Sequence, residues 1–216
     1  MPTAGRLILV MGSVGLVAAV LLVATYQFTL PIIQKNRAAY LSESITEVLP
    51  GAVRYAAFVA SDSAGFVPAP ERSEGSRIFA GYNEADSLVG LAVEAQGQGY
   101  ADIIRLLYGF DPECRCIVGL KVLESKETPG IGDKPPKDPG FVATLRRLET
   151  RNEPDLATIE LVKKGQKTQP WQIEAITGAT VTSRALTGIL AASTAAIVPL
   201  LAEHLDQLRT PPAEDS

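Results

Sequence analysis

The sequence is poor in the residues that build most metal and haem sites. It has two cysteines and one histidine among 216 residues, and it contains no Cys-x-x-Cys-His motif. These counts exclude a disulfide-rich scaffold, a four-thiolate metal site and c-type haem attachment. A histidine-rich zinc site needs more imidazoles than His204 supplies, so we expect no metal site.

A basic excess is also missing. The chain has 20 Lys and Arg residues against 24 Asp and Glu residues, a net charge of −4. A nucleic-acid-binding protein carries a basic footprint, so we expect no nucleic-acid partner. The composition is not that of a disordered chain, because 46% of the residues are hydrophobic and only 20% are charged.

One long uncharged run lies near the N-terminus. Residues 7–30, LILVMGSVGLVAAVLLVATYQFTL, follow Arg6 and precede Lys35 and Arg37. As a helix, this run reaches about 36 Å, enough to cross a membrane. We predict a short tail over 1–6 and a retained transmembrane helix over 7–30, with a cleaved signal peptide as the alternative. The flanking charges do not fix the orientation.

The remaining chain predicts one α+β domain over residues 50–216, after an amphipathic connecting helix over 31–49 that Pro50 and Gly51 end. The apolar run 185–202 is rich in small residues and contains Pro199, so we interpret it as a packing helix and not a second span. We expect strands at 53–60, 77–82, 88–94, 102–110, 116–124, 158–163 and 172–176, helices at 141–148 and 183–208, and loops at 61–76 and 126–140.

A small-residue turn precedes the last predicted helix. It reads Thr177-Gly178-Ala179-Thr180, with Thr182 and Ser183 directly after it. Gly178 and Ala179 allow close backbone approach to a ligand, and the hydroxyl groups can cap the helix. Free amides and the positive end of the helix dipole favour a phosphate. An ordinary Ser/Thr-capped helix start is the alternative interpretation.

Three stretches resemble one known family. The 177–180 turn resembles the Ser/Thr-Gly-Ala-Thr flavinylation motif of the G-subunit family of the Rnf complex, which is related to the C subunit of the sodium-pumping NADH:quinone reductase. Residues 127–132, Glu-Thr-Pro-Gly-Ile-Gly, are similar to that family's Glu-Thr-Pro-Gly-Leu-Gly loop, and Gly99-Tyr100 is similar to its Gly-Tyr element. Glu174 matches the family's acidic residue before the motif, whereas Ser125 stands where the family often has His.

The resemblance implies a covalent flavoprotein in which FMN is bound by a phosphoester to Thr180, with Thr182 as the second choice. A flavin transferase would install the group from FAD. It implies an FMN-binding domain without catalytic residues of its own. The implied cofactor-binding residues are Glu127, Thr128, Pro129, Gly130, Ile131, Thr177, Gly178, Ala179, Thr180, Thr182 and Ser183.

The resemblance also implies a function and a location. The chain would be an electron-transfer subunit of an Rnf-type ion-translocating ferredoxin:NAD⁺ oxidoreductase and would assemble with the A, B, C, D and E subunits. It would cross the inner (cytoplasmic) membrane once, in contact with lipid, and place the flavin domain on the periplasmic, extracytoplasmic side. The alternatives are a stand-alone membrane-tethered flavin module of another redox or sensing system, and a structural anchor protein whose turn is incidental.

Several residues keep more than one interpretation. Tyr100 and Trp171 either stack on the flavin or belong to the core, and Arg184 either faces the phosphate or is solvated. Lys163, Lys164 and Lys167 form a solvated loop or a docking surface. Cys114 and Cys116 form a disulfide, contribute to an iron–sulfur cluster shared with a partner, or are cysteines without a redox role.

Overall fold

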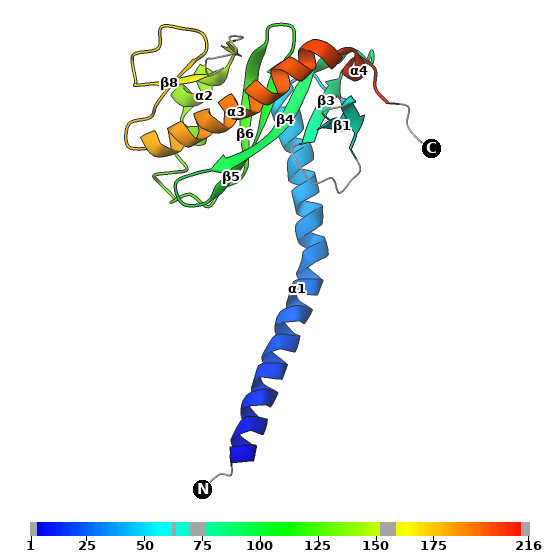
Figure 1. Cartoon of the computed structure of the whole chain (residues 1–216), viewed down its shortest axis with the longest axis vertical. Helices are drawn as coiled ribbons and strands as arrows, with labels where there is room; N and C mark the ends of the chain where they lie inside the picture. Colours follow the sequence, from blue (N-terminus) through cyan, green and yellow to red (C-terminus); the bar gives the residue numbers. More distant parts are fainter. Residues whose placement is uncertain (1–3, 62–63, 70–76, 152–158, 213–216) are drawn as a thin grey trace. The chain divides into compact units, whose positions relative to one another are not determined.

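A computed structural model of the chain describes residues 4–61, 64–69, 77–151 and 159–212 (Figure 1). The chain divides into two compact units, Met1–Ser42 and Glu43–Ser216.

The described part of the first unit, residues 4–42, lies within helix α1 (Ala4–Val48), which also extends into the second unit. It is one continuous helix through Pro31, so the segments 7–30 and 31–49 share a single element. Its apolar window is long enough to cross a membrane, and no residue of that window is buried. The last turn belongs to the second unit, where Ser44, Ile45 and Val48 are buried.

The second unit is built on a seven-stranded antiparallel sheet with the strand order β2-β1-β3-β4-β5-β6-β7. Its strands are β1 (Arg54–Ser61), β2 (Gly65–Pro68), β3 (Arg77–Tyr82), β4 (Leu88–Gln98), β5 (Ile103–Asp111), β6 (Cys116–Glu124) and β7 (Leu148–Glu149). A separate parallel pair joins β8 (Glu160–Val162) to β9 (Gln172–Glu174). The helices of this unit are the 3-10 helix η1 (Pro135–Lys137), α2 (Pro139–Leu145), α3 (Thr180–His204) and α4 (Asp206–Arg209).

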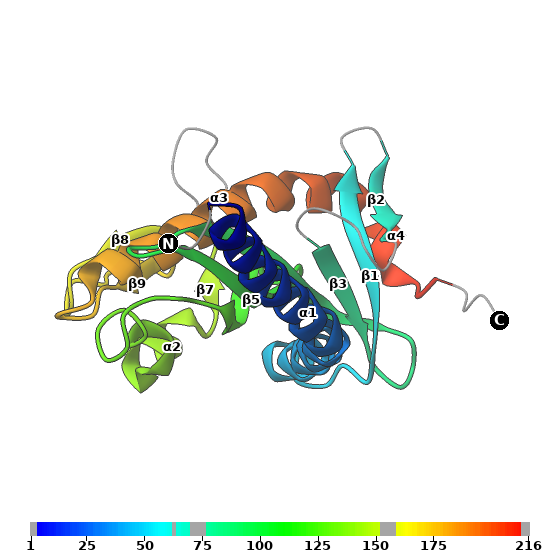
Figure 2. The same cartoon turned by 90° about the horizontal axis from the view of Figure 1, so that it is seen from below.

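One face of the sheet is covered by α3, which lies along β4 (Figures 1 and 2). Alternate residues of β5 enter the core on this face, as the two-residue period of a strand requires: Ile104, Leu106, Tyr108 and Phe110. The Tyr108 hydroxyl lies 2.9 Å from Ser193 Oγ on α3. Residues Leu186, Ile189, Leu190, Ile197, Val198 and Leu201 of α3 are buried in the same cluster, so this apolar helix is a packing helix of the domain.

The opposite face of the sheet receives the end of α1. Val48 and the following Leu49 are each only 2% exposed. A Cβ added to glycines on this face would collide with one or the other of these two residues, so the helix end packs against bare backbone. The glycines form two cross-strand pairs in the register: Gly81 with Gly90, and Gly109 with Gly119.

Parts of the sequence-based assignment are wrong. Strand β2 lies inside the predicted loop 61–76, where Gln207 accepts a hydrogen bond from the Phe66 amide (2.8 Å) and donates one to the Ala64 carbonyl (3.1 Å). Gln207 is about 140 residues from these partners in the sequence, so no local sequence pattern indicates the strand. The helix predicted to Leu148 ends at Leu145, because Arg147 has a positive φ of 58° and Leu148 pairs in β7. Residue 158 of the strand predicted at 158–163 lies outside the described residues.

Candidate functional site

The turn at residues 177–180 leads directly into α3, which begins at Thr180. Gly178 has a φ of +83°, a conformation that glycine adopts without strain. Ala179 is the N-cap residue, and within the described residues no side chain caps this helix end. Ser183 closes the turn from inside, since its hydroxyl accepts from the Ile176 amide (3.2 Å) and donates to the Ala179 carbonyl (2.9 Å). The amides of the first turn therefore lack the side-chain partner that a capped helix has.

The hydroxyl groups of this segment differ sharply in accessibility. Thr177 and Thr180 are exposed, whereas Thr182 and Ser183 are buried. Thr180 Oγ1 makes only a long hydrogen bond to the Ile176 carbonyl, at 3.4 Å. Thr182 Oγ1 donates to Glu127 Oε2 at 3.3 Å, inside the protein. Of the two threonines proposed to carry a flavin, only Thr180 presents its side chain to solvent.

The loop at residues 127–132 folds as a tight turn. Thr128 O accepts from the amides of Ile131 (3.2 Å) and Gly132 (2.9 Å), and Gly130 takes a positive φ of 78°. Asp133 Oδ1 accepts from the Gly130 amide (2.6 Å) and Oδ2 from Lys137 Nζ (2.5 Å). The Lys137 ammonium, followed by the Gly130 amide, holds the pKa of Asp133 below its ordinary value. The exposed part of the loop runs from Thr128 to Ile131.

Glu127 is the exception in this loop, because its side chain is buried. One carboxylate oxygen accepts from the Ala101 amide at 2.9 Å, and the other accepts from Thr182. A neighbouring ion pair, Lys126 Nζ to Asp102 Oδ2 at 2.9 Å, also connects the segment next to Glu127 with the segment around Ala101 at the surface. The hydrogen bond from Lys126 is the main reason that the pKa of Asp102 is lowered. The structure thus brings together three stretches that are distant in sequence: 99–102, 127–132 and 177–182.

Three large apolar side chains are exposed around this meeting point. Tyr100 is 71% exposed, Ile131 56% and Val181 50%. Each is adjacent in sequence to a residue that lies against the Glu127 side chain, namely Ala101, Gly132 and Thr182. We call these three side chains the apolar rim. The sequence reasoning missed Val181, although its place between two threonines of the motif was a usable signal.

The other residues singled out from the sequence have protein partners or lie in solvent. The Arg151 guanidinium covers the Trp171 ring at 5.0 Å from its centroid. Glu174 accepts from the Lys167 amide at 3.2 Å and so closes the turn that it follows. Ser125 Oγ accepts from the Glu127 amide at 3.2 Å. Arg184, Lys163 and Lys164 are exposed, and His204 is half-buried.

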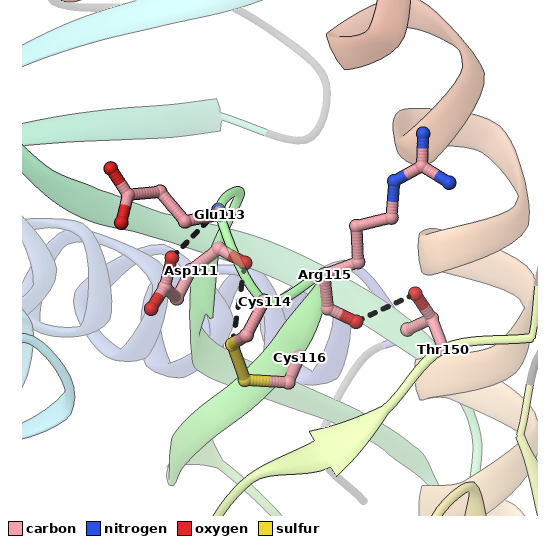
Figure 3. Close-up of a disulfide and its surroundings, with 6 residues drawn as sticks. All are labelled: Asp111, Glu113, Cys114, Arg115, Cys116 and Thr150. Carbon is pink, nitrogen blue, oxygen red and sulfur yellow. Dashed lines mark hydrogen bonds between the residues drawn. A yellow bond between two sulfur atoms is a disulfide. The ribbon is translucent and has the colours of Figure 1, made fainter.

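Cys114 and Cys116 form a disulfide in the turn between β5 and β6 (Figure 3). The turn has further ties, because Asp111 Oδ1 accepts from the Glu113 amide (2.8 Å) and the Thr150 hydroxyl donates to the Arg115 carbonyl (2.9 Å). Figure 3 shows the Arg115 side chain pointing away from the sulfur atoms. Asp111 and Ala101 lie at opposite ends of β5, a strand of about 26 Å, so the disulfide is separate from the site around Glu127.

This site suits a flavin mononucleotide in three respects. An exposed hydroxyl at Thr180 stands at a helix N-terminus without a side-chain cap, where a phosphate is favoured. The apolar rim offers the kind of surface on which a flat heteroaromatic ring rests. A Cβ added to Gly130 or to Gly178 would meet no atom within 4 Å, so the approach to the turn backbone is open there.

The three stretches fall inside a region that is similar to a known family. Residues 99–194, which contain all three stretches, match the family described as "FMN-binding domain". The chain is 28% identical to the G subunit of the ion-translocating oxidoreductase complex of Methanosarcina acetivorans, over 86% of this chain and 89% of that protein. It is 27% identical to the G subunit of the Na⁺-translocating ferredoxin:NAD⁺ oxidoreductase complex of Acetobacterium woodii, over 84% and 86% of the two chains.

The fold also has a counterpart among solved structures. The C subunit of the Na⁺-translocating NADH-quinone reductase of Parabacteroides distasonis superposes with a TM-score of 0.52 at 14% identity, covering 74% of this chain and 80% of that one. The fold and the site therefore define an α+β FMN-binding domain that follows an apolar N-terminal helix. Over most of its length the chain is similar to the G subunits of ion-translocating oxidoreductase complexes.

Proposed function

We propose that this protein is the membrane-anchored electron-transfer subunit of an Rnf-type ion-translocating ferredoxin:NAD⁺ oxidoreductase, with FMN bound covalently through its phosphate to Thr180. The observation that carries the proposal is the exposed Thr180 hydroxyl at the uncapped start of α3, inside a matched FMN-binding domain. The names of the relatives supply the complex and the reaction.

Burial supports Thr180 over Thr182 as the attachment residue. Attachment from FAD joins the threonine oxygen to the FMN phosphorus, breaks the phosphoanhydride bond, releases AMP and removes the hydroxyl proton. A transferase must therefore reach the oxygen. Thr182 is only 4% exposed and its hydroxyl is engaged with Glu127, whereas Thr180 is at the surface.

Residues of this chain would hold the group in two ways. The free amides and the dipole of α3 stabilise the phosphate, and Arg184 in the first turn is exposed and able to add a positive charge. The apolar rim and the exposed part of the loop, Thr128 to Ile131, are the surfaces available to the ring. FMN, when bound, supplies the electron transfer, and the chain supplies position and electrostatic surroundings.

The remaining parts of the proposal concern assembly. The apolar helix α1 anchors the subunit, and the flavin domain lies on the periplasmic side, where a covalent link prevents loss of the cofactor. The partners are the other subunits of the complex, A to E, and a flavin transferase. We propose no independent catalytic activity for this chain.

The test is co-expression of the full-length chain with a flavin transferase, followed by intact mass and in-gel flavin fluorescence of the denatured protein. The wild type gains the mass of FMN minus water and fluoresces, and Thr180→Val does neither. Thr187→Val is the matched control, since it removes a buried α3 hydroxyl that donates to the Ser183 carbonyl (2.9 Å). Peptide mass spectrometry that locates the flavin on Thr182, or a fluorescent Thr180→Val protein, contradicts the assignment.

A further inference from the structure

The Glu127 carboxylate stands where three loops of the flavin domain meet, and it contacts two of them. It accepts from the Ala101 amide at 2.9 Å and from the Thr182 hydroxyl at 3.3 Å, while its own backbone begins the third. The side chain is 7% exposed. It is therefore enclosed by the site and is not a surface ligand for a cofactor.

Two glycines make the space for this carboxylate. A Cβ on Gly132 would lie 2.6 Å from Glu127 Oε2 and 2.7 Å from its Cβ, and a Cβ on Gly99 would overlap Oε1. Gly99 precedes the exposed Tyr100, and Gly132 follows the exposed Ile131. The carboxylate thus sets how closely the two loops that carry Tyr100 and Ile131 approach each other.

The partners of the Glu127 carboxylate differ from those of the chain's other buried glutamate that the structure describes, Glu94. Glu94 is also 7% exposed, but Arg77 donates to both of its carboxylate oxygens at 3.0 Å. Within the described parts of the chain, the partners of the Glu127 carboxylate are an amide and a hydroxyl, both on neutral groups. The positive end of the α3 dipole lies at the turn that carries Thr182, so the helix start itself compensates the charge.

We propose that Glu127 and Thr182 are a positioning pair, which fixes the first turn of α3 against the loops 99–102 and 127–132 and so orients the Thr180 hydroxyl for flavin attachment. This inference rests on the proposed attachment at Thr180. Glu127 and Thr182, which the resemblance placed among the cofactor-binding residues, then support the site without contacting the cofactor. Thr180 and Val181 project outward because the next residue, Thr182, is tied inward.

The pairing predicts a specific pattern of attachment rates, measured by intact mass against time with the full chain and the flavin transferase. Thr182→Val slows attachment about tenfold, the factor for one lost hydrogen bond to a charged group, and Glu127→Ala, which also loses the bond from the Ala101 amide, slows it at least as much. Their double variant is no slower than Glu127→Ala alone. Thr182→Ser and Glu127→Gln, which retain hydrogen-bonding groups, recover the rate to within about threefold.

Matched controls separate positioning from general stability. Thr187→Val removes a buried hydroxyl from the same helix, and Glu94→Ala removes the other buried glutamate. Both are expected to attach flavin at nearly the wild-type rate, although Glu94→Ala lowers the melting temperature. Equal slowing by Glu94→Ala and Glu127→Ala, or a wild-type rate in Thr182→Val, overturns the proposal.

A second readout does not depend on the flavin. Hydrogen–deuterium exchange of the Ala101 amide is expected to be about tenfold faster in Glu127→Ala than in the wild type or Glu94→Ala, because its acceptor is lost. If the wild type carries no covalent flavin, the proposed function fails, and this exchange still decides the positioning role. An unchanged Ala101 exchange rate in a folded Glu127→Ala protein refutes that role.

Discussion

Alanine at Gly109 tests the packing of the α1 end against the sheet. A Cβ there would lie 3.1 Å from the Val48 carbonyl carbon, closer still to its oxygen, and 3.0 Å from Val118 Cγ2. Carbon atoms in ordinary contact are about 3.5–4.0 Å apart, so the helix end must lift by roughly 0.5–1 Å. Overpacking of this kind costs about 1–3 kcal/mol. The upper limit, complete loss of burial of Val48 and Leu49, is about 3–6 kcal/mol.

Gly188 provides the control with the opposite sign. It lies in α3, is exposed, and has nothing within 4 Å of its added Cβ. Alanine there replaces a poor helix former with the best one and stabilises the domain by about 1 kcal/mol. Replacement of glycine by alanine is therefore expected to destabilise the domain at Gly109 and to stabilise it at Gly188.

The assay is thermal unfolding of the full chain in detergent, without the transferase, followed by the fluorescence of Trp171, the single tryptophan. For a domain of this size, 1 kcal/mol shifts Tm by about 2–4 °C. We expect Gly109→Ala to lower Tm by about 4–8 °C and Gly188→Ala to raise it by about 2–4 °C. If Gly109→Ala unfolds at the wild-type temperature or above, the close approach of Val48 to the sheet is wrong.

Two further predictions follow from local contacts. Replacing Cys114 and Cys116 by serine opens a loop of only three residues. The unfolding free energy measured in urea titrations is therefore expected to fall by about 1.6 kcal/mol, and flavin attachment is expected to stay unchanged. A loss of more than about 3 kcal/mol contradicts this expectation. Lys137 and the Gly130 amide lower the pKa of Asp133 in the folded protein. Its contacts therefore stabilise the loop fully at pH values above the ordinary aspartate pKa of about 3.9, and this stabilisation is lost as the pH falls through the lower folded-state pKa. The Gly130 amide shift should titrate below about pH 4 in NMR spectra and stay constant in Asp133→Asn.

Local sequence signals were sufficient for the long elements. A β-type run predicted β5 at 102–110, and Arg77–Tyr82 and Cys116–Glu124 were predicted with their observed bounds. The uncharged run predicted an apolar helix near the N-terminus. These signals work because the backbone period and side-chain burial are coupled within one element.

The sequence predicted which segments form the candidate site but not which of their side chains face outward. The motif around Thr180 and the loop around Glu127 both lie within the matched FMN-binding domain. Their residues were assigned to the ligand as one set, however. Which of them face outward depends on where α3 begins, and the helix starts at Thr180 instead of the predicted Ser183.

What the sequence by itself determined is the order of the long elements, the apolar helix and the resemblance to a known family, because each depends on a contiguous pattern. Only the tertiary structure decided that Glu127 turns inward to Thr182, 55 residues away, and that Thr180 stays exposed. It also decided the role of Gly109, which weakens a strand by its own propensity and is needed because another segment approaches it. Burial and hydrogen bonding between distant segments depend on the packed chain, and no local pattern encodes them.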